Sequence, residues 1–164
     1  MRLILLFLIS FIAFGASAVQ CNINFNEKDF IDSLALKPLE VKVIKDDGVT
    51  KRQYKFRKEL STEEAFNEDS EKNYEPQFYI DIYEFSCPNR VKIWFHEDNN
   101  NTTNLSNKKL AGRAFKYLTG VNEVIFENKM RKFTNVQSFE SFDNKTESRF
   151  LKVGDVYSVD VFLK

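Results

Sequence analysis

The sequence predicts an α+β fold in which a single antiparallel sheet of about five to seven strands carries one principal helix, residues 106–119. Several short runs of β-branched and aromatic residues are separated by turn residues, a pattern typical of antiparallel strands. Residues 106–119 have the apolar spacing of an amphipathic helix. We expect one α+β domain over residues 19–164, preceded by a signal peptide at residues 1–18.

The first 18 residues have the pattern of a secretory signal peptide. Arg2 precedes the apolar run LILLFLISFIAFG, and Ala16, Ser17 and Ala18 then form an A-x-A cleavage site. A membrane-spanning helix needs about 20 apolar residues, so this run is too short to anchor the protein. We therefore expect cleavage after Ala18, no integral membrane association of the mature chain, and a secreted or periplasmic location.

The expected mature chain is nearly neutral and rich in phenylalanine. Removing 18 of the 164 residues leaves 146, with 23 basic and 24 acidic residues and a net charge of −1. Nucleic-acid binding requires an excess of Lys and Arg that this chain lacks. Fourteen of the 17 phenylalanines follow residue 18, so we expect an aromatic core that does not depend on a metal or on several disulfides.

The mature chain begins with a short helix and a hairpin. The segment FIDSLAL, residues 30–36, has apolar residues at helical spacing. Two strand-forming runs, 41–44 and 54–56, flank the turn signal Asp46-Asp47-Gly48, where glycine can adopt a positive φ without a Cβ clash. The pattern predicts one or two helical turns followed by a β-hairpin.

A capping box predicts a second short helix. Ser61 and Glu64 have the S-x-x-E spacing in which side chains and backbone amides exchange hydrogen bonds at a helix start. We expect this helix over residues 62–68 and a polar linker over residues 69–76.

The central hairpin has the strongest strand signal. Residues 78–85 and 91–95 are β-branched and aromatic, with Cys87-Pro88-Asn89 between them. A three-residue loop there would pair Ser86 with Arg90. Tyr83 would then face Ile93, and Trp94 and His96 would lie on the opposite face of the sheet.

The principal helix is expected to begin with Ser106 as its cap and to end at Gly120, which favours the left-handed conformation. The apolar side chains of this segment lie on one stripe. Three further strand-like segments follow, at residues 121–127, 132–142 and 150–163. These segments complete the predicted sheet.

The chain has two cysteines, Cys21 and Cys87. Export leads to an oxidising compartment, so we expect a Cys21–Cys87 disulfide. Cys21 is alternatively a lipid-attachment cysteine, although Gln20 is poorly suited to the preceding position. A third hypothesis is that Cys87 is a catalytic thiolate, a role that would need a free thiol and a nearby base.

No complete catalytic or metal-binding motif is present in the sequence. His96 is the single histidine, and a triad would also need a nucleophile and an orienting carboxylate. The signatures G-x-S-x-G and H-E-x-x-H do not occur. One histidine and two cysteines cannot complete a tetrahedral zinc site. We therefore expect no metal and no cofactor.

Aromatic residues of the central hairpin are the candidates for binding. Trp94, Tyr83 and His96 form the expected site, since aromatic rings provide large contact area, although a core under a helix predicts the same residues. We expect an exported, non-enzymatic binding protein with a protein partner, such as an inhibitor or immunity-type factor. One alternative is a small hydrolase that uses His96 with carboxylates such as Asp81, Glu84 or Glu97. Another is a surface or structural component of a larger assembly.

Overall fold

A computed structural model describes residues 23–58, 77–96, 102–132, 138–141 and 146–164. Within this part of the chain, seven strands form one antiparallel sheet in the order β1-β2-β3-β4-β7-β6-β5. The strands are β1 (Glu40–Asp46), β2 (Val49–Lys55), β3 (Phe78–Tyr83), β4 (Arg90–His96), β5 (Ser138–Ser141), β6 (Thr146–Val153) and β7 (Val156–Leu163). The helices are α1 (Glu27–Ser33), α3 (Thr102–Thr119) and α4 (Glu123–Lys132). The predicted α+β fold with a single antiparallel sheet is confirmed.

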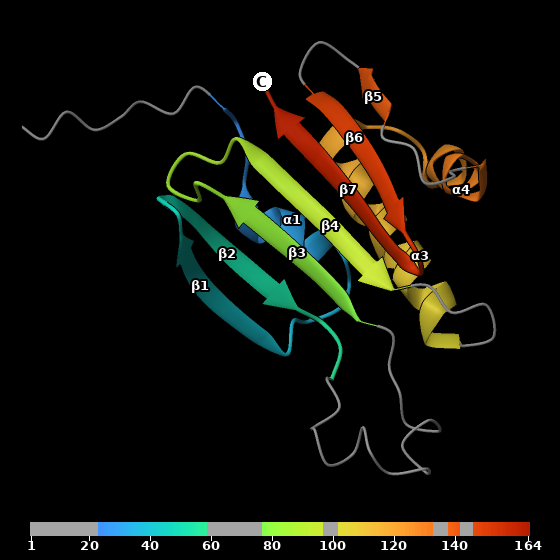
Figure 1. Ribbon diagram of the computed structural model, residues 1–164, viewed down its shortest axis with the longest axis horizontal. Helices are drawn as coiled ribbons and strands as arrows, with labels where there is room; N and C mark the ends of the chain where they lie inside the picture. The colour runs from blue at the N-terminus through green and yellow to red at the C-terminus, as the bar shows by residue number, and fades with distance from the viewer. Residues whose placement is uncertain (1–22, 59–76, 97–101, 133–137, 142–145) are drawn as a thin grey trace, which may run out of the picture.

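The molecule has two layers, because α1 and α3 lie behind the sheet and leave its other face toward the viewer (Figure 1). In β4 the residues that face the helices, Val91, Ile93 and Phe95, are apolar and buried, and alternate residues point the opposite way. None of the described helices is both long and apolar enough to cross a membrane.

Phenylalanine rings join the helix layer to the sheet. The Phe115 ring of α3 lies 4.9 Å from the Phe126 ring of α4 and 5.6 Å from the Phe150 ring of β6, measured between centroids. These three rings are almost fully buried. The helix layer is also tied together by Arg113 of α3, whose Nη1 donates to the carbonyl of Leu34 at 3.0 Å.

The first hairpin follows the expected turn chemistry. Asp47 and Gly48 have φ values of +46° and +78°, and they connect strands in which Asp46 pairs with Val49. Two consecutive positive φ values define the turn whose twist matches that of the flanking strands. The short helix before it also forms, with Asn26 Oδ1 accepting from the amide of Asp29 at 3.2 Å. The helix expected at 62–68 and the linker at 69–76 lie outside the described residues.

A cluster of polar side chains attaches α1 to β2. Arg52 Nη1 donates to both Glu27 carboxylate oxygens, at 2.7 and 2.8 Å, and the Tyr54 hydroxyl donates to the same carboxylate. Burial, together with the adjacent Glu27 carboxylate, raises the pKa of Tyr54 to about 12. This cluster fixes where α1 lies over its end of the sheet.

The expected strand at 121–127 is wrong, because this segment begins α4. Gly120 ends α3 with a φ of +74°, and Asn122 then caps α4 by accepting from the amide of Val124 at 2.8 Å. The apolar residues do not alternate as in a half-buried strand. Phe126 and Met130, four residues apart, are buried on one helix face.

The last part of the sheet is divided differently from the prediction. Residues 150–163 do not form one strand, because a turn at Gly154 separates β6 from β7. Of the segment 132–142, Lys132 ends α4 and residues 138–141 form the short strand β5, whereas the other residues lie outside the described part of the chain. The principal helix is confirmed, although α3 begins at Thr102 rather than Ser106.

The phenylalanine cluster is expected to carry a large part of the stability. Phe115→Ala should lower the free energy of unfolding by about 3–5 kcal/mol, because it removes a buried ring and leaves a cavity between two layers. Urea unfolding followed by circular dichroism measures this change. Val124→Ala on exposed helix surface is the control, and it should change stability by about 0.5 kcal/mol or less. A loss below about 1 kcal/mol in Phe115→Ala would contradict the assigned role of the cluster.

Candidate functional site

The face of the sheet that points away from the helices is the candidate site, and we call it the open face. Among the described residues, no helix covers it (Figure 1). The strand register places the side chains of neighbouring strands in rows across it. Its central residues are Lys51, Gln53 and Lys55 of β2, Tyr79, Asp81 and Tyr83 of β3, Arg90, Lys92, Trp94 and His96 of β4, Ser158 and Asp160 of β7, and Arg149 of β6.

The observed register of the central hairpin corrects the predicted one. Tyr83 pairs with Arg90, and Ile80 pairs with Ile93, so the connection spans six residues, 84–89. Glu84 has a φ of +51°, and its carbonyl accepts from the amide of Cys87 at 2.7 Å, which forms a turn earlier than expected. The register shifts by three residues relative to the prediction. An odd shift exchanges the two faces, so Tyr83 lies on the same face as Trp94.

An aromatic stack occupies one end of the open face. The rings of Tyr79 and Trp94 pair across β3 and β4, with centroids 4.1 Å apart and planes 9° apart. The His96 ring lies beside Trp94, with a centroid distance of 6.2 Å. Trp94 and His96 are half-buried and keep part of their surface open to solvent. The structure thus brings together two of the three expected binding residues.

Tyr83, the third expected residue, lies at the other end of the open face. Its ring is covered by the Arg90 guanidinium, whose central carbon is 3.6 Å from the ring centroid. Four residues separate Tyr79 from Tyr83 along β3, a distance of roughly 13 Å. Burial is the main cause of the raised pKa of Tyr83. The open face therefore has two separate aromatic groups rather than one cluster.

A row of charged side chains lies between the two aromatic groups. Asp81 is only 2% exposed and accepts hydrogen bonds from Lys51 Nζ and Gln53 Nε2, both at 2.8 Å. Lys92 of β4 lies between Asp81 and Asp160 in the register. This row alternates in charge across three strands, which favours a single arrangement of its side chains.

Asp160 is the least well satisfied of these charged residues. Its Oδ1 is buried without a hydrogen bond from any described residue, and Arg90 Nε lies 3.8 Å away. Burial raises the pKa of Asp160 above its ordinary value of 3.8, although Lys92, Arg90 and Arg149 each act in the opposite direction. Desolvation therefore outweighs the attraction of the neighbouring cations.

The carboxylates proposed for hydrolysis do not gather around His96. Along β4, His96 is four residues from Lys92, which pairs with Asp81, so the row containing Asp81 is roughly 13 Å away. Glu84 lies in the turn at the opposite end of the hairpin, and Glu97 lies outside the described residues. In the described part of the chain, no three His, Cys, Asp or Glu side chains are grouped so as to hold a metal ion.

The disulfide prediction is not tested by the described residues. Cys21 lies outside them, whereas Cys87 is half-buried in the turn between β3 and β4. No free cysteine occurs in the described part of the chain.

Comparisons with known proteins do not assign the open face. No protein-family model matches the chain, and neither a curated protein nor a solved structure matches it significantly. We therefore infer the function from the geometry and chemistry of the chain itself.

Sequence reasoning missed the charged centre of the open face. Asp81 lies between Ile80 and Ile82, and Asp160 lies between Val159 and Val161. An acid between two β-branched residues signals a strand with one apolar and one polar face. The sequence pattern could not show that Asp81 and Asp160 pair with opposite sides of the same residue, Lys92.

Replacing Asp160 tests whether burial of its charge destabilises the fold. The pKa of Asp160 is raised in the folded protein, so the folded state holds the carboxyl proton more tightly than the unfolded state does. The stabilisation that comes from this proton is full below pH 3.8 and is lost as pH rises through the pKa of folded Asp160. Asp160→Asn should therefore gain stability relative to the parent at pH 7, and this gain should shrink toward pH 4. Urea unfolding at both pH values measures it.

Asp155→Asn, in the exposed turn between β6 and β7, is the control for the lost negative charge. A less stable Asp160→Asn variant at pH 7 would show instead that attraction to the neighbouring cations dominates.

Proposed function

We propose that the protein is an exported, non-enzymatic binding protein whose open face docks another protein. One observation carries this proposal: a whole sheet face, uncovered in the described structure, presents stacked aromatic rings and ordered charges. Trp, Tyr and Arg are the residues most enriched among the energetic centres of protein interfaces. Trp94 and the Tyr83–Arg90 pair supply these residue types at the two ends of the face.

The size of the open face supports a protein partner. Six strand spacings of about 4.8 Å give a width of roughly 29 Å, and seven residues at about 3.3 Å give a length of roughly 23 Å. The product of these two lengths, about 670 Å², is of the same order as the 800 Å² or so that each partner buries in a standard interface. An extended sheet face of this size suits a protein better than a small molecule, which needs a concave site.

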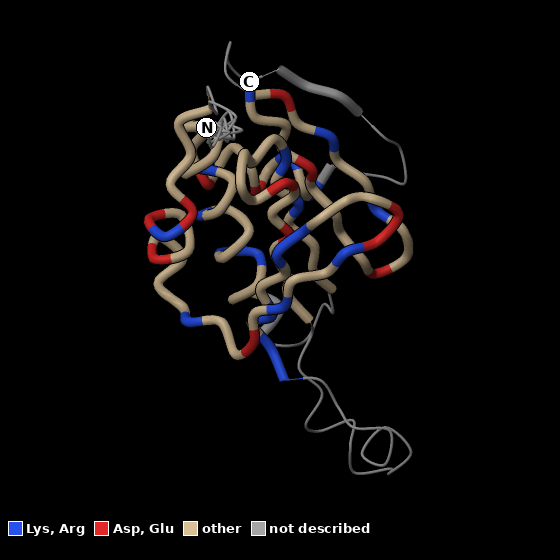
Figure 2. The backbone as a smooth tube through the Cα atoms, turned by 90° about the vertical axis from the view of Figure 1, so that its left-hand side faces the viewer, with Lys and Arg blue, Asp and Glu red and all other residues tan. Residues whose placement is uncertain are grey.

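The charges of the open face favour a partner with acidic side chains. Its strands present six cations, Lys42, Lys51, Lys55, Arg90, Lys92 and Arg149, and five acids, Glu40, Asp46, Asp81, Glu147 and Asp160. Figure 2 marks the basic and acidic residues along the described backbone. Asp81 is buried and already accepts two hydrogen bonds. The accessible charge is therefore mainly positive, and complementary charge would steer an acidic partner onto the face.

Variants on the open face test this proposal once a partner has been captured from the exported fraction of the native host and purified. Trp94→Ala should weaken the complex by about 30-fold or more, as expected for a contact centre. The double variant Lys42→Gln, Lys55→Gln should slow association and reduce its salt dependence. Titration calorimetry and stopped-flow mixing measure these changes.

Lys116→Gln on α3 is the matched control, because it removes an exposed charge from the helix layer. Melting temperatures show whether Trp94→Ala still folds. Equal affinity of the parent and both open-face variants would contradict the docking surface.

His96→Ala should bind the partner with an affinity within a few-fold of that of the parent. If it abolished turnover of a substrate at an unchanged melting temperature, the hydrolase alternative would replace the binding protein.

Export and disulfide formation belong to the same proposal. We propose that residues 1–18 are removed as a signal peptide and that Cys21 and Cys87 are joined in the oxidising compartment. Intact-mass measurement of protein from the native host should give a chain that begins at Val19 and carries no lipid. Non-reducing peptide mapping should give one cross-linked pair. A diacylglyceryl adduct on Cys21, or two free thiols, would contradict the proposal.

A further inference from the structure

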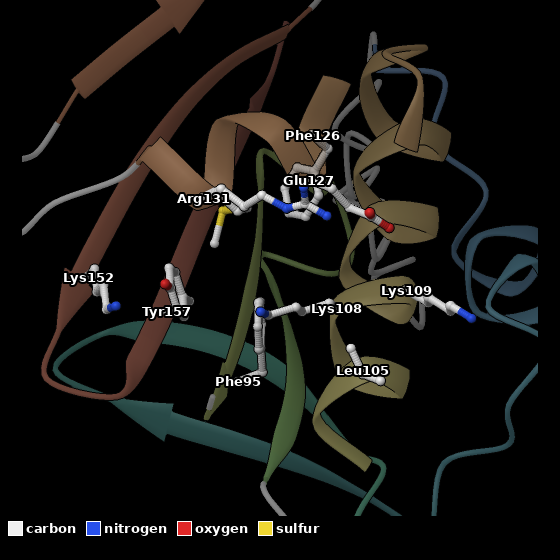
Figure 3. A pocket seen from close by; sticks show the side chains of 10 residues that line it. Phe95, Leu105, Lys108, Lys109, Phe126, Glu127, Arg131, Lys152 and Tyr157 are labelled. Carbon is white, nitrogen blue, oxygen red and sulfur yellow. The ribbon is translucent and has the colours of Figure 1, made fainter. Parts of the chain in front are cut away.

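A cavity of about 400 Å³ lies on the helix side of the sheet, between α3, α4 and the ends of β4, β6 and β7 (Figure 3). This volume falls within the range of roughly 300–1,000 Å³ that is usual for sites of small ligands. The cavity and the open face lie in different layers of the molecule.

The inner wall of the cavity is apolar. Phe95 and Tyr157 come from the sheet, with ring centroids 5.4 Å apart and planes 15° apart. Phe126 and Met130 come from α4 and are almost fully buried. Leu105 of α3, which is 61% exposed, extends this apolar wall to the mouth of the cavity.

The polar part of the cavity is mainly basic. Among the described residues that line it, four carry positive charge, Lys108, Lys109, Arg131 and Lys152, and one carries negative charge, Glu127. Figure 3 shows Lys108 and Lys152 extending from opposite sides toward Tyr157, whereas Lys109 extends away from the cavity. Lys152 Nζ lies 4.7 Å from the centroid of the Tyr157 ring.

We propose that this cavity binds an amphipathic anion, a small molecule with a carboxylate head and an aliphatic tail. The carboxylate pairs with Lys108 and Lys152, and the tail packs on Leu105, the exposed part of the apolar wall, and on Met130. Burial of the tail provides most of the affinity, since each methylene removed from water strengthens binding by about fourfold. The two ammonium groups select the charged head, because a carboxylate between them forms charge-assisted hydrogen bonds.

Titration with decanoate below its micelle concentration tests the proposed ligand class. Decanoate should bind the full mature protein saturably, with one site per chain. Decanol and decyltrimethylammonium have the same tail with no charge and with a positive charge, respectively. Each should bind at least about tenfold more weakly, because neither can accept charge-assisted hydrogen bonds from the lysines. Equal binding of the three compounds, or no binding of decanoate, would overturn the proposal.

Variants of the cavity lysines show where decanoate binds. The double variant Lys108→Gln, Lys152→Gln should bind it at least about tenfold more weakly than the parent, whereas Lys109→Gln on the same helix should retain most of the affinity. Thermal melting without ligand shows that each variant is folded. Equal affinity of the double variant and Lys109→Gln would overturn the assignment.

An anionic head joined to an aliphatic tail occurs both in free fatty acids, where the head is a carboxylate, and in membrane lipids such as phosphatidylglycerol, where it is a phosphate diester. Binding of monomeric decanoate supports an enclosed site for a free anion. Binding only to phosphatidylglycerol vesicles, with none to monomeric decanoate, would overturn that site. The open-face variant Trp94→Ala should bind decanoate normally, so the test does not depend on the proposed protein partner.

Discussion

The register of β3 against β4 is the constraint on which both surfaces of the sheet depend. Because side chains alternate along a strand, the pairing of Ile80 with Ile93 places one set of residues against the helices. The same pairing stacks Tyr79 on Trp94 on the other face. Any odd slip would bring charged residues toward Phe115 and expose the apolar set to water. The β3–β4 register therefore determines both which residues form the core and which residues form the open face.

The open face is held by its own contacts as well as by the core behind it. Asp81 accepts from side chains of β2, while Lys92 and Asp160 continue the charged row onto β4 and β7. Isolated surface ion pairs contribute little, typically about 0–1 kcal/mol. Their effect here is to fix side-chain positions across several strands, and a surface that is already ordered loses less entropy when it binds.

The nearly neutral chain carries its charge unevenly in space. The cavity lining has four cations and one acid among the described residues, and the open face has an excess of cations. Acids gather elsewhere, as with Glu27, Asp29 and Asp32 on α1. The net charge shows that the chain lacks an overall excess of basic residues, and the expectation of no nucleic-acid partner depends on that lack. It does not report the local groups that the fold creates from residues far apart in sequence.

The sequence alone determined the features that depend on neighbouring residues. Local backbone preferences and helical periodicity were enough to predict the turn at Asp47 and Gly48 and the end of α3 at Gly120. The aromatic composition of the core could likewise be predicted from the sequence. The open-face residues Trp94 and His96 could be proposed from residue type, but their shared face with Tyr83 could not. Only the tertiary structure decided the β3–β4 register, the helical state of residues 123–132 and the cavity between α3 and α4. Each of these depends on packing between distant segments, where burial against Phe115 or Phe150 outweighs local preference.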